Sequence, residues 1–188
     1  CSKHKEFIGY ATLHPDMTNE QVEKEIERVV KKGFKGIKLH PDFQRFDIDD
    51  KKADKIYAIA QDTLPILFHT GDDRFDYSSP ERLARTAKKF PKLKCIAAHF
   101  GGYTRWSEID VYDGIENVFF DTSSSLFKLP DLMAKDILKH LGYERFMFGT
   151  DFPMWTHKEE LQRFLQLGLK DSVNEDILYN NAKRILTI

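Results

Sequence analysis

Short runs of β-branched and aromatic residues alternate with helical patterns along this chain, and this alternation constrains its fold more than any other feature. The runs predict six strands, at residues 7–13, 36–40, 66–70, 94–99, 118–121 and 146–151. Strands separated by helices pair in parallel, because each crossover returns the chain to the same end of the sheet. The sequence therefore predicts an α/β protein with a parallel sheet.

The segments between the strands carry helix signals. Thr18 and Gln21 fit a capping box, in which each side chain satisfies a free backbone amide at the start of a helix. Ser79 and Pro80 open another helix, since proline is favoured in the first turn. Further helices are predicted at residues 52–62, 104–112, 130–141, 158–167 and 174–186.

The spacing of the strand ends sets the size of the repeat. The polar residues that close five of the predicted strands are His40, His69, His99, Asp121 and Asp151, at steps of 29, 30, 22 and 30 residues. Each step holds one right-handed strand–helix unit. A (β/α)₈ TIM barrel needs about 250 residues, whereas this chain has 188. We predict a single TIM-barrel-like domain over residues 1–188 with about six of the eight units; an open doubly wound sheet is the alternative.

Composition places the chain among ordinary globular proteins. Of its residues, 41% are hydrophobic and 31% are charged, and the net charge is -1. This balance argues against disorder and against a nucleic-acid binder, which would carry a strongly basic face. No apolar run approaches the roughly 20 residues that span a bilayer, and the first residues are too polar for a signal peptide. We therefore expect a cytoplasmic protein that acts on a small molecule and has no nucleic-acid or membrane partner.

The residues that close the strands combine imidazole with carboxylate. The carboxyl ends of parallel strands meet at one face, where ligands bind. His40, His69 and His99 close successive strands, and Asp151 closes the last one. Histidine and aspartate together suit a borderline divalent ion; Zn²⁺ is favoured, and Mn²⁺ or Fe²⁺ is compatible with the same set. The pattern indicates a metal or acid–base site at this face.

Five short motifs in a consistent order carry a family resemblance. They are Gly36-Ile37-Lys38-Leu39-His40-Pro41, Phe68-His69-Thr70-Gly71, Ala98-His99-Phe100-Gly101-Gly102, Gly149-Thr150-Asp151-Phe152-Pro153 and Asn181-Ala182-Lys183-Arg184-Ile185-Leu186. In this combination the chain closely resembles the amidohydrolase superfamily. Within it, the chain is similar to the amidohydrolase-related branch that also contains aminocarboxymuconate-semialdehyde decarboxylase-like enzymes.

The resemblance implies a metal-dependent barrel enzyme. It implies that His69 is a metal ligand, that His99 is the catalytic histidine, and that Asp151 is both a metal ligand and a catalytic residue. A bound divalent ion would lower the pKa of a water molecule to about 7 and polarise a substrate oxygen. Asp151 would then transfer the proton, and His99 would hydrogen-bond the oxygen on which negative charge develops.

This chain departs from the family pattern at the first strand of the family. That strand carries a His-x-His pair that supplies two metal ligands, and no two of the seven histidines here are separated by a single residue. His69 and Asp151 are two ligands, where a catalytic zinc usually has three. We therefore expect this chain to be the C-terminal portion of a longer enzyme, and we predict that these residues alone lack metal-dependent turnover.

Two classes of function stay open. The first is metal-dependent hydrolysis of a small amide, ester or lactone-like bond, with non-oxidative decarboxylation of a small unsaturated or aromatic acid as its close rival. The second is a non-catalytic truncated barrel that binds a ligand or a partner. Pairing of its open strand edges with another subunit, including a homo-oligomer, belongs to this second class.

Five further residues have both a structural and a functional interpretation. His40 either faces the pocket or simply ends a strand, and Trp155 either lines a substrate pocket or packs against neighbouring loops. Lys38 invites comparison with the carboxylated lysine of two-metal superfamily members, but lysines at such positions more often pair with a carboxylate. Arg74 and Arg105 either grip a substrate carboxylate or are solvated.

Overall fold

The computed structural model describes residue 4 and residues 6–188, and six parallel strands form one sheet in the order β1-β2-β3-β4-β5-β6. The strands are β1 (Tyr10–Ala11), β2 (Gly36–Leu39), β3 (Ile66–Phe68), β4 (Cys95–Ala97), β5 (Val118–Asp121) and β6 (Phe146–Met147). Each strand pairs with the next along the chain, so that Ile37 lies opposite Ile66 and Ile66 opposite Cys95. All six predicted strands are present, and five of them are shorter than predicted.

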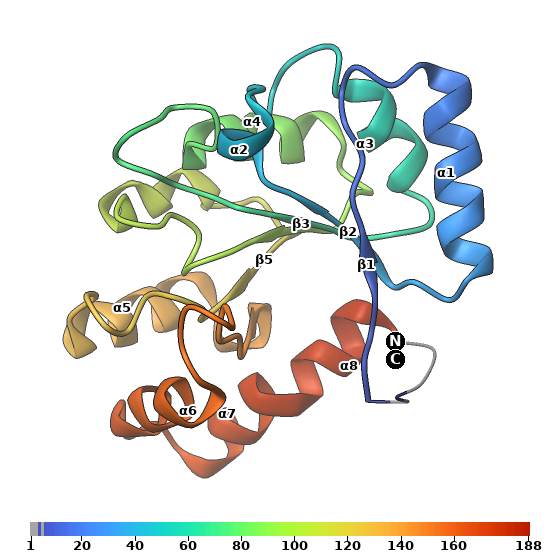
Figure 1. Ribbon diagram of the computed structural model, residues 1–188. Coiled ribbons are helices and arrows are strands. Elements are labelled where there is room, and N and C mark those ends of the chain that lie inside the picture. The colour runs from blue at the N-terminus through green and yellow to red at the C-terminus, as the bar shows by residue number, and fades with distance from the viewer. Residues whose placement is uncertain (1–3, 5) are drawn as a thin grey trace.

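The sequential strand order separates the two predicted architectures. A doubly wound sheet reverses its strand order at a switch point, whereas a barrel adds each strand beside the previous one. No reversal occurs among the six described strands, and Figure 1 shows them as one curved sheet with helices around it. The structure therefore confirms a TIM-barrel-like fold with six strand–helix units in this chain.

The helices lie mainly where the sequence predicts them. They are α1 (Asn19–Lys31), α2 (Pro41–Gln44), α3 (Asp54–Ala60), α4 (Pro80–Lys89), η1 (Trp106–Tyr112), α5 (Asp131–Leu141), η2 (Tyr143–Arg145), α6 (His157–Gln166), α7 (Asp171–Glu175), η3 (Asp176–Asn180) and α8 (Asn181–Leu186). The predicted capping box is present, since the Thr18 side chain accepts from the Gln21 amide and the Gln21 side chain from the Thr18 amide. Among the described residues, no helix combines the length and apolar character needed to cross a membrane.

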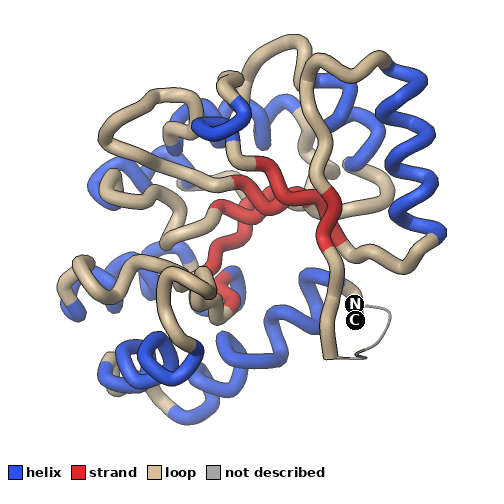
Figure 2. Tube along the Cα trace, viewed as in Figure 1, coloured by secondary structure: helices blue, strands red, loops and turns tan. Residues whose placement is uncertain are grey.

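The two faces of the sheet pack against different helices, as Figure 2 helps to follow. Ile66 and Phe68 belong to the main core beneath the surrounding helices. Leu67, between them in β3, points to the other face and packs in a smaller cluster with Ile96 and with Ile185 of α8. This alternation is the two-residue period of a strand. Helix α8 thus covers part of the inner face, and the carboxyl ends of the strands remain available for a site.

Candidate active site

The three histidines predicted from the strand ends lie side by side. His40 follows β2, His69 follows β3, and His99 lies two residues beyond β4. The rings of His40 and His69 are stacked, with centroids 3.9 Å apart and planes inclined by 10°. The ring of His99 meets that of His69 edge-on at a centroid separation of 4.9 Å. Parallel strands in register bring these residues together, as the sequence predicts.

A chain of hydrogen bonds sets the protons on His69 and His99. The backbone carbonyl of Ser123 lies 3.0 Å from His99 Nδ1 and can only accept, so that nitrogen carries the proton. His99 Nε2 then accepts from His69 Nδ1, also at 3.0 Å. Burial lowers the pKa of both imidazoles, so both are neutral near pH 7. The lone pair that remains on His69 is on Nε2.

Three ligand-type atoms in this cluster are buried and have no hydrogen-bond partner among the described residues: His40 Nδ1, Asp42 Oδ1 and His69 Nε2. His40, Asp42 and His69 each offer one ligand atom within 4.8 Å of the other two. Two imidazole nitrogens and a carboxylate oxygen are donors that a divalent ion takes. The donor set therefore fits the metal implied by the family resemblance.

Asp42 is the functional candidate that the sequence reasoning missed. Its side chain is 1% exposed, and Asp42 Oδ2 lies 3.8 Å from His69 Nε2. Burial raises the pKa of this carboxyl, while a hydrogen bond from Ser78 lowers it. In the sequence, Asp42 follows His40 by two residues and lies in the short helix α2, which begins at Pro41.

Asp151 lines the same cavity as the three histidines, from the loop after β6, which ends at Met147. Asp151 Oδ2 accepts a hydrogen bond of 2.8 Å from Ser124 Oγ, and Ser124 Oγ accepts one of 3.0 Å from Trp155 Nε1. The Trp155 ring lies 4.3 Å below the Arg163 guanidinium. Trp155 therefore supports Asp151 through Ser124.

The three histidines, Ser124 and Asp151 line one cavity of about 290 Å³, and Asp42 is not among its walls. Its walls include Lys38, His40, His69, His99, Ser124, Asp151 and Arg74, but not Trp155. Lys38 lies at the inner face of β2, where burial lowers its pKa and the carboxylates of Asp121 and Asp151 raise it. A larger cavity, about 400 Å³, lies around Lys35 and Lys94 at the opposite ends of the strands and contains no histidine. The chemistry is thus concentrated in the smaller cavity.

Backbone strain is concentrated at the same place. His99, Phe100, Ser124 and Asp151 all have positive φ, between 46° and 62°. Such conformations are costly for residues other than glycine and persist mainly where the surrounding structure enforces them, often at functional sites.

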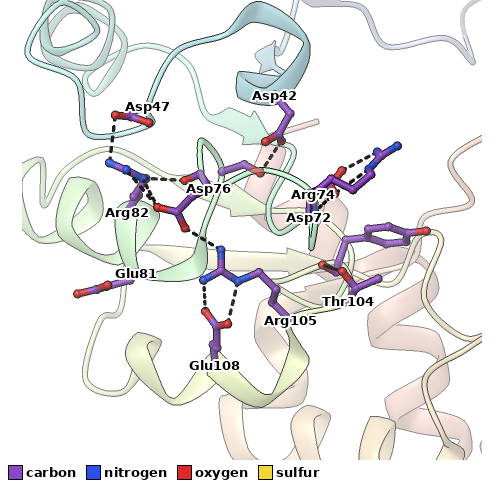
Figure 3. A network of polar contacts seen from close by, with 12 residues as sticks. Asp42, Asp47, Asp72, Arg74, Asp76, Glu81, Arg82, Thr104, Arg105 and Glu108 are labelled. Carbon is purple, nitrogen blue, oxygen red and sulfur yellow. Dashed lines mark hydrogen bonds and ion pairs between the residues drawn. The ribbon is translucent and has the colours of Figure 1, made fainter.

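A network of ion pairs holds the loop between β3 and α4, as Figure 3 shows. Asp76 binds Arg105 at 2.9 Å and Arg82 at 3.1 Å, which joins the loop between β3 and α4 to η1 and α4. Arg74, on that loop, is held by Asp72 at 2.7 Å and lines the cavity. Arg105 does not line it and pairs with Asp76 and Glu108.

Comparison with known proteins finds a matching family model and solved structures with a similar fold. The family model described as amidohydrolase matches residues 1–188. A TIM-barrel protein of uncharacterised function from Bordetella bronchiseptica is 26% identical with a TM-score of 0.82, over 96% of this chain and 66% of that one, so this chain spans just under two thirds of its length.

Two further solved structures share the fold. A dihydroxybenzoic acid decarboxylase from a Polaromonas species, with bound manganese and the inhibitor 2-nitroresorcinol, is 19% identical (TM-score 0.75; 96% of this chain, 69% of that chain). A Pseudomonas putida protein assigned as a 2-pyrone-4,6-dicarboxylic acid hydrolase is 17% identical (TM-score 0.72; 96% and 71%).

Proposed function

The chain belongs to the amidohydrolase family, and from this premise we propose that its cavity serves metal-dependent decarboxylation of a small aromatic or unsaturated acid. One observation carries the proposal. Lys38 shares the cavity with the neutral imidazoles of His69 and His99 and with the carboxylate-bearing Asp151. An ammonium ion there would bind a substrate carboxylate beside groups that accept and donate protons. The likeness to a decarboxylase with bound manganese supports the same choice.

His69 would hold the divalent ion, and the family resemblance adds Asp151 as a second ligand. When bound, Zn²⁺ or Mn²⁺ polarises a substrate oxygen and lowers the pKa of bound water. The buried, unpartnered Nε2 of His69 is the observation that fits such an ion.

Each of these side chains has its own role in the proposed reaction. Lys38 binds and orients the substrate carboxylate, and His99, whose Nε2 accepts from His69 Nδ1, fixes the tautomer that leaves His69 Nε2 free. Asp151 delivers a proton to the carbon that bears the carboxylate. The bond between that carbon and the carboxylate then breaks, its electron pair returns to the substrate carbon skeleton, and CO₂ leaves. Solvent replaces the proton on Asp151, so one proton is consumed for each CO₂ released.

Hydrolysis of an ester, amide or lactone-like bond is the second candidate. It is favoured by Asp151, a carboxylate on the cavity wall that can accept a proton from a water molecule. The likeness to a protein assigned as a hydrolase of a pyrone dicarboxylic acid supports this candidate too.

The test uses protein produced from its natural gene, loaded with Mn²⁺ and incubated in D₂O with a panel of hydroxybenzoates and lactones. We expect CO₂ release, with one deuterium on the carbon that carried the carboxylate. Lys38→Met should raise KM at least about tenfold, the equivalent of losing one charge-assisted hydrogen bond, whereas Lys35→Met, at the opposite ends of the strands, should not. Ring opening of lactones without CO₂ release would replace the proposal by the hydrolase.

A further inference from the structure

We propose that Asp121, the last residue of β5, is a positioning residue that fixes the tautomer of His99 by holding the hydroxyl hydrogen of Ser123. Asp121 is not among the walls of the cavity, so it acts on the site through Ser123 and His99. The inference rests on the proposed function only in giving this tautomer a role in turnover. Its main test reads the protons on the histidines without metal or substrate.

One oxygen of Asp121 accepts three hydrogen bonds. Asp121 Oδ1 lies 3.0 Å from the backbone nitrogen of His99, 2.9 Å from that of Ser123 and 2.6 Å from Ser123 Oγ. The two backbone nitrogens can only donate, and a carboxylate oxygen can only accept. Asp121 therefore joins the segment after β4 to the segment after β5.

The backbone of His99 needs such support. Its φ is 62°, in the left-handed region that residues other than glycine adopt only at a cost. Asp121 Oδ1 accepts from its amide, and Trp106 Nε1 donates to its carbonyl at 2.9 Å. His99 is thus held on both sides of its strained torsion, which fixes the direction of its buried imidazole.

The hydrogen bonds between His69 and Asp121 form one chain in which every donor points the same way. His69 Nδ1 donates to His99 Nε2. His99 Nδ1 lies 3.0 Å from both the carbonyl oxygen and the hydroxyl oxygen of Ser123. Because the Ser123 hydroxyl gives its hydrogen to Asp121, its oxygen faces His99 as an acceptor. The carboxylate at the end of the chain thereby keeps the lone pair of His69 on Nε2.

Removal of this carboxylate would free the Ser123 hydroxyl to donate to His99 Nδ1, which would move the proton of His99 to Nε2. The Ser123 carbonyl is a weak competitor, because it already accepts from Ser125 Oγ at 2.9 Å. His99 Nε2 would then donate to His69 Nδ1, and His69 would carry its proton on Nε2, where the proposed metal ligand needs a lone pair. Asp121 thus decides between the two directions of the chain.

The experiment is ¹⁵N nuclear magnetic resonance of the histidine side chains in the metal-free protein near pH 7. The wild-type protein should carry the proton on Nδ1 of both His69 and His99. Asp121→Ala should shift the tautomer ratio of His99 towards Nε2 at least about tenfold, the effect of losing one charge-assisted hydrogen bond. Asp113→Ala is the matched control, because Asp113 binds His140 at 2.8 Å and is not among the walls of the cavity.

A conservative variant and a double variant separate this role from a merely structural one. Asp121→Asn should keep the wild-type tautomer, because two backbone amides hold the side-chain oxygen of asparagine in the place of Oδ1. In Asp121→Ala combined with Ser123→Ala, the hydroxyl is gone and the backbone carbonyl at position 123 still faces His99 Nδ1, so the proton should return to that nitrogen.

Two results would overturn the proposal: an Nδ1 tautomer retained in Asp121→Ala, or an Nε2 tautomer retained in the double variant. If Asp121→Ala does not fold, as judged by circular dichroism, the wild-type protein and Asp121→Asn decide. A proton on His99 Nε2 in either of them would contradict the direction of the chain.

Turnover provides a second measurement. In the proposed reaction, kcat of Asp121→Ala should fall at least about tenfold, and kcat of Asp113→Ala should not. An unchanged kcat beside a shifted tautomer would overturn the role of Asp121 in turnover and leave the proposed function standing. Failure of the wild-type protein to release CO₂ would count against the proposed function alone, because the tautomer is read without substrate.

Discussion

At the scale of single residues, the site is built from side chains whose partners leave a particular atom free. Ser123 and His99 fix the proton on His69 Nδ1, which leaves Nε2 available. The sequence indicates His69, His99 and Asp151 because each lies at the end of a predicted strand. It did not indicate Asp42, because the burial of a carboxylate in a short helix depends on Ser78, which is distant in the chain.

Ser124 provides a prediction at this scale. Its hydroxyl accepts from Trp155 and donates to Asp151 Oδ2, so its removal leaves that carboxylate without a fixed donor. Ser124→Ala should lower kcat for the proposed reaction roughly tenfold with little change in KM. Ser124→Thr, which keeps the hydroxyl, should recover most of the rate.

Steady-state kinetics of the two variants tests this prediction. Ser172→Ala, a substitution on α7 away from the cavity, is the control. An unchanged kcat in Ser124→Ala would show that Asp151 does not depend on this hydroxyl.

At the scale of elements, boundaries were less predictable than the existence of strands and helices. Residues 104–112 were predicted as a helix, and the structure has a 3₁₀-helix at Trp106–Tyr112. Helix α2 was not predicted, because four residues show no helical period and only the proline at its start marks it. The helix predicted at 174–186 begins at Asp171 and includes the π-helical turn η3. Local patterns do not encode such changes of helical type.

The loop between β3 and α4 provides a prediction about pH. The Arg105 guanidinium, with help from Arg82, holds the pKa of Asp76 below its usual range, and partial burial opposes this. A pKa that is lower in the folded state stabilises the protein above the unfolded value of about 3.9, and this stabilisation disappears as the pH falls through the folded value.

Asp76→Asn should therefore reduce the free energy of unfolding by about 1 kcal/mol or less near pH 7, as expected for an exposed ion pair. The difference from the wild-type protein should shrink as the pH falls below about 4 and vanish once the pH is below the folded-state pKa of Asp76. Urea unfolding of both proteins across this range measures it. A difference that stays constant with pH would exclude the carboxylate charge as its cause.

At the scale of the whole molecule, the order of the strands determines where the chemistry can lie. Six parallel strands in sequential order place all their carboxyl ends on one face, so residues 29 or 30 positions apart become neighbours. The strand-end spacing predicted this arrangement, because one crossover helix needs about that length. It could not predict the packing of α8 on Leu67 and Ile96, since that contact depends on the inward alternation of each strand.

The central claim is that His69 lies at a divalent-metal site within this cavity. Anomalous diffraction from crystals grown with Mn²⁺ tests it most directly. We predict one strong peak about 2.0 to 2.3 Å from His69 Nε2. A cavity without a peak at saturating Mn²⁺ would contradict the metal-dependent account.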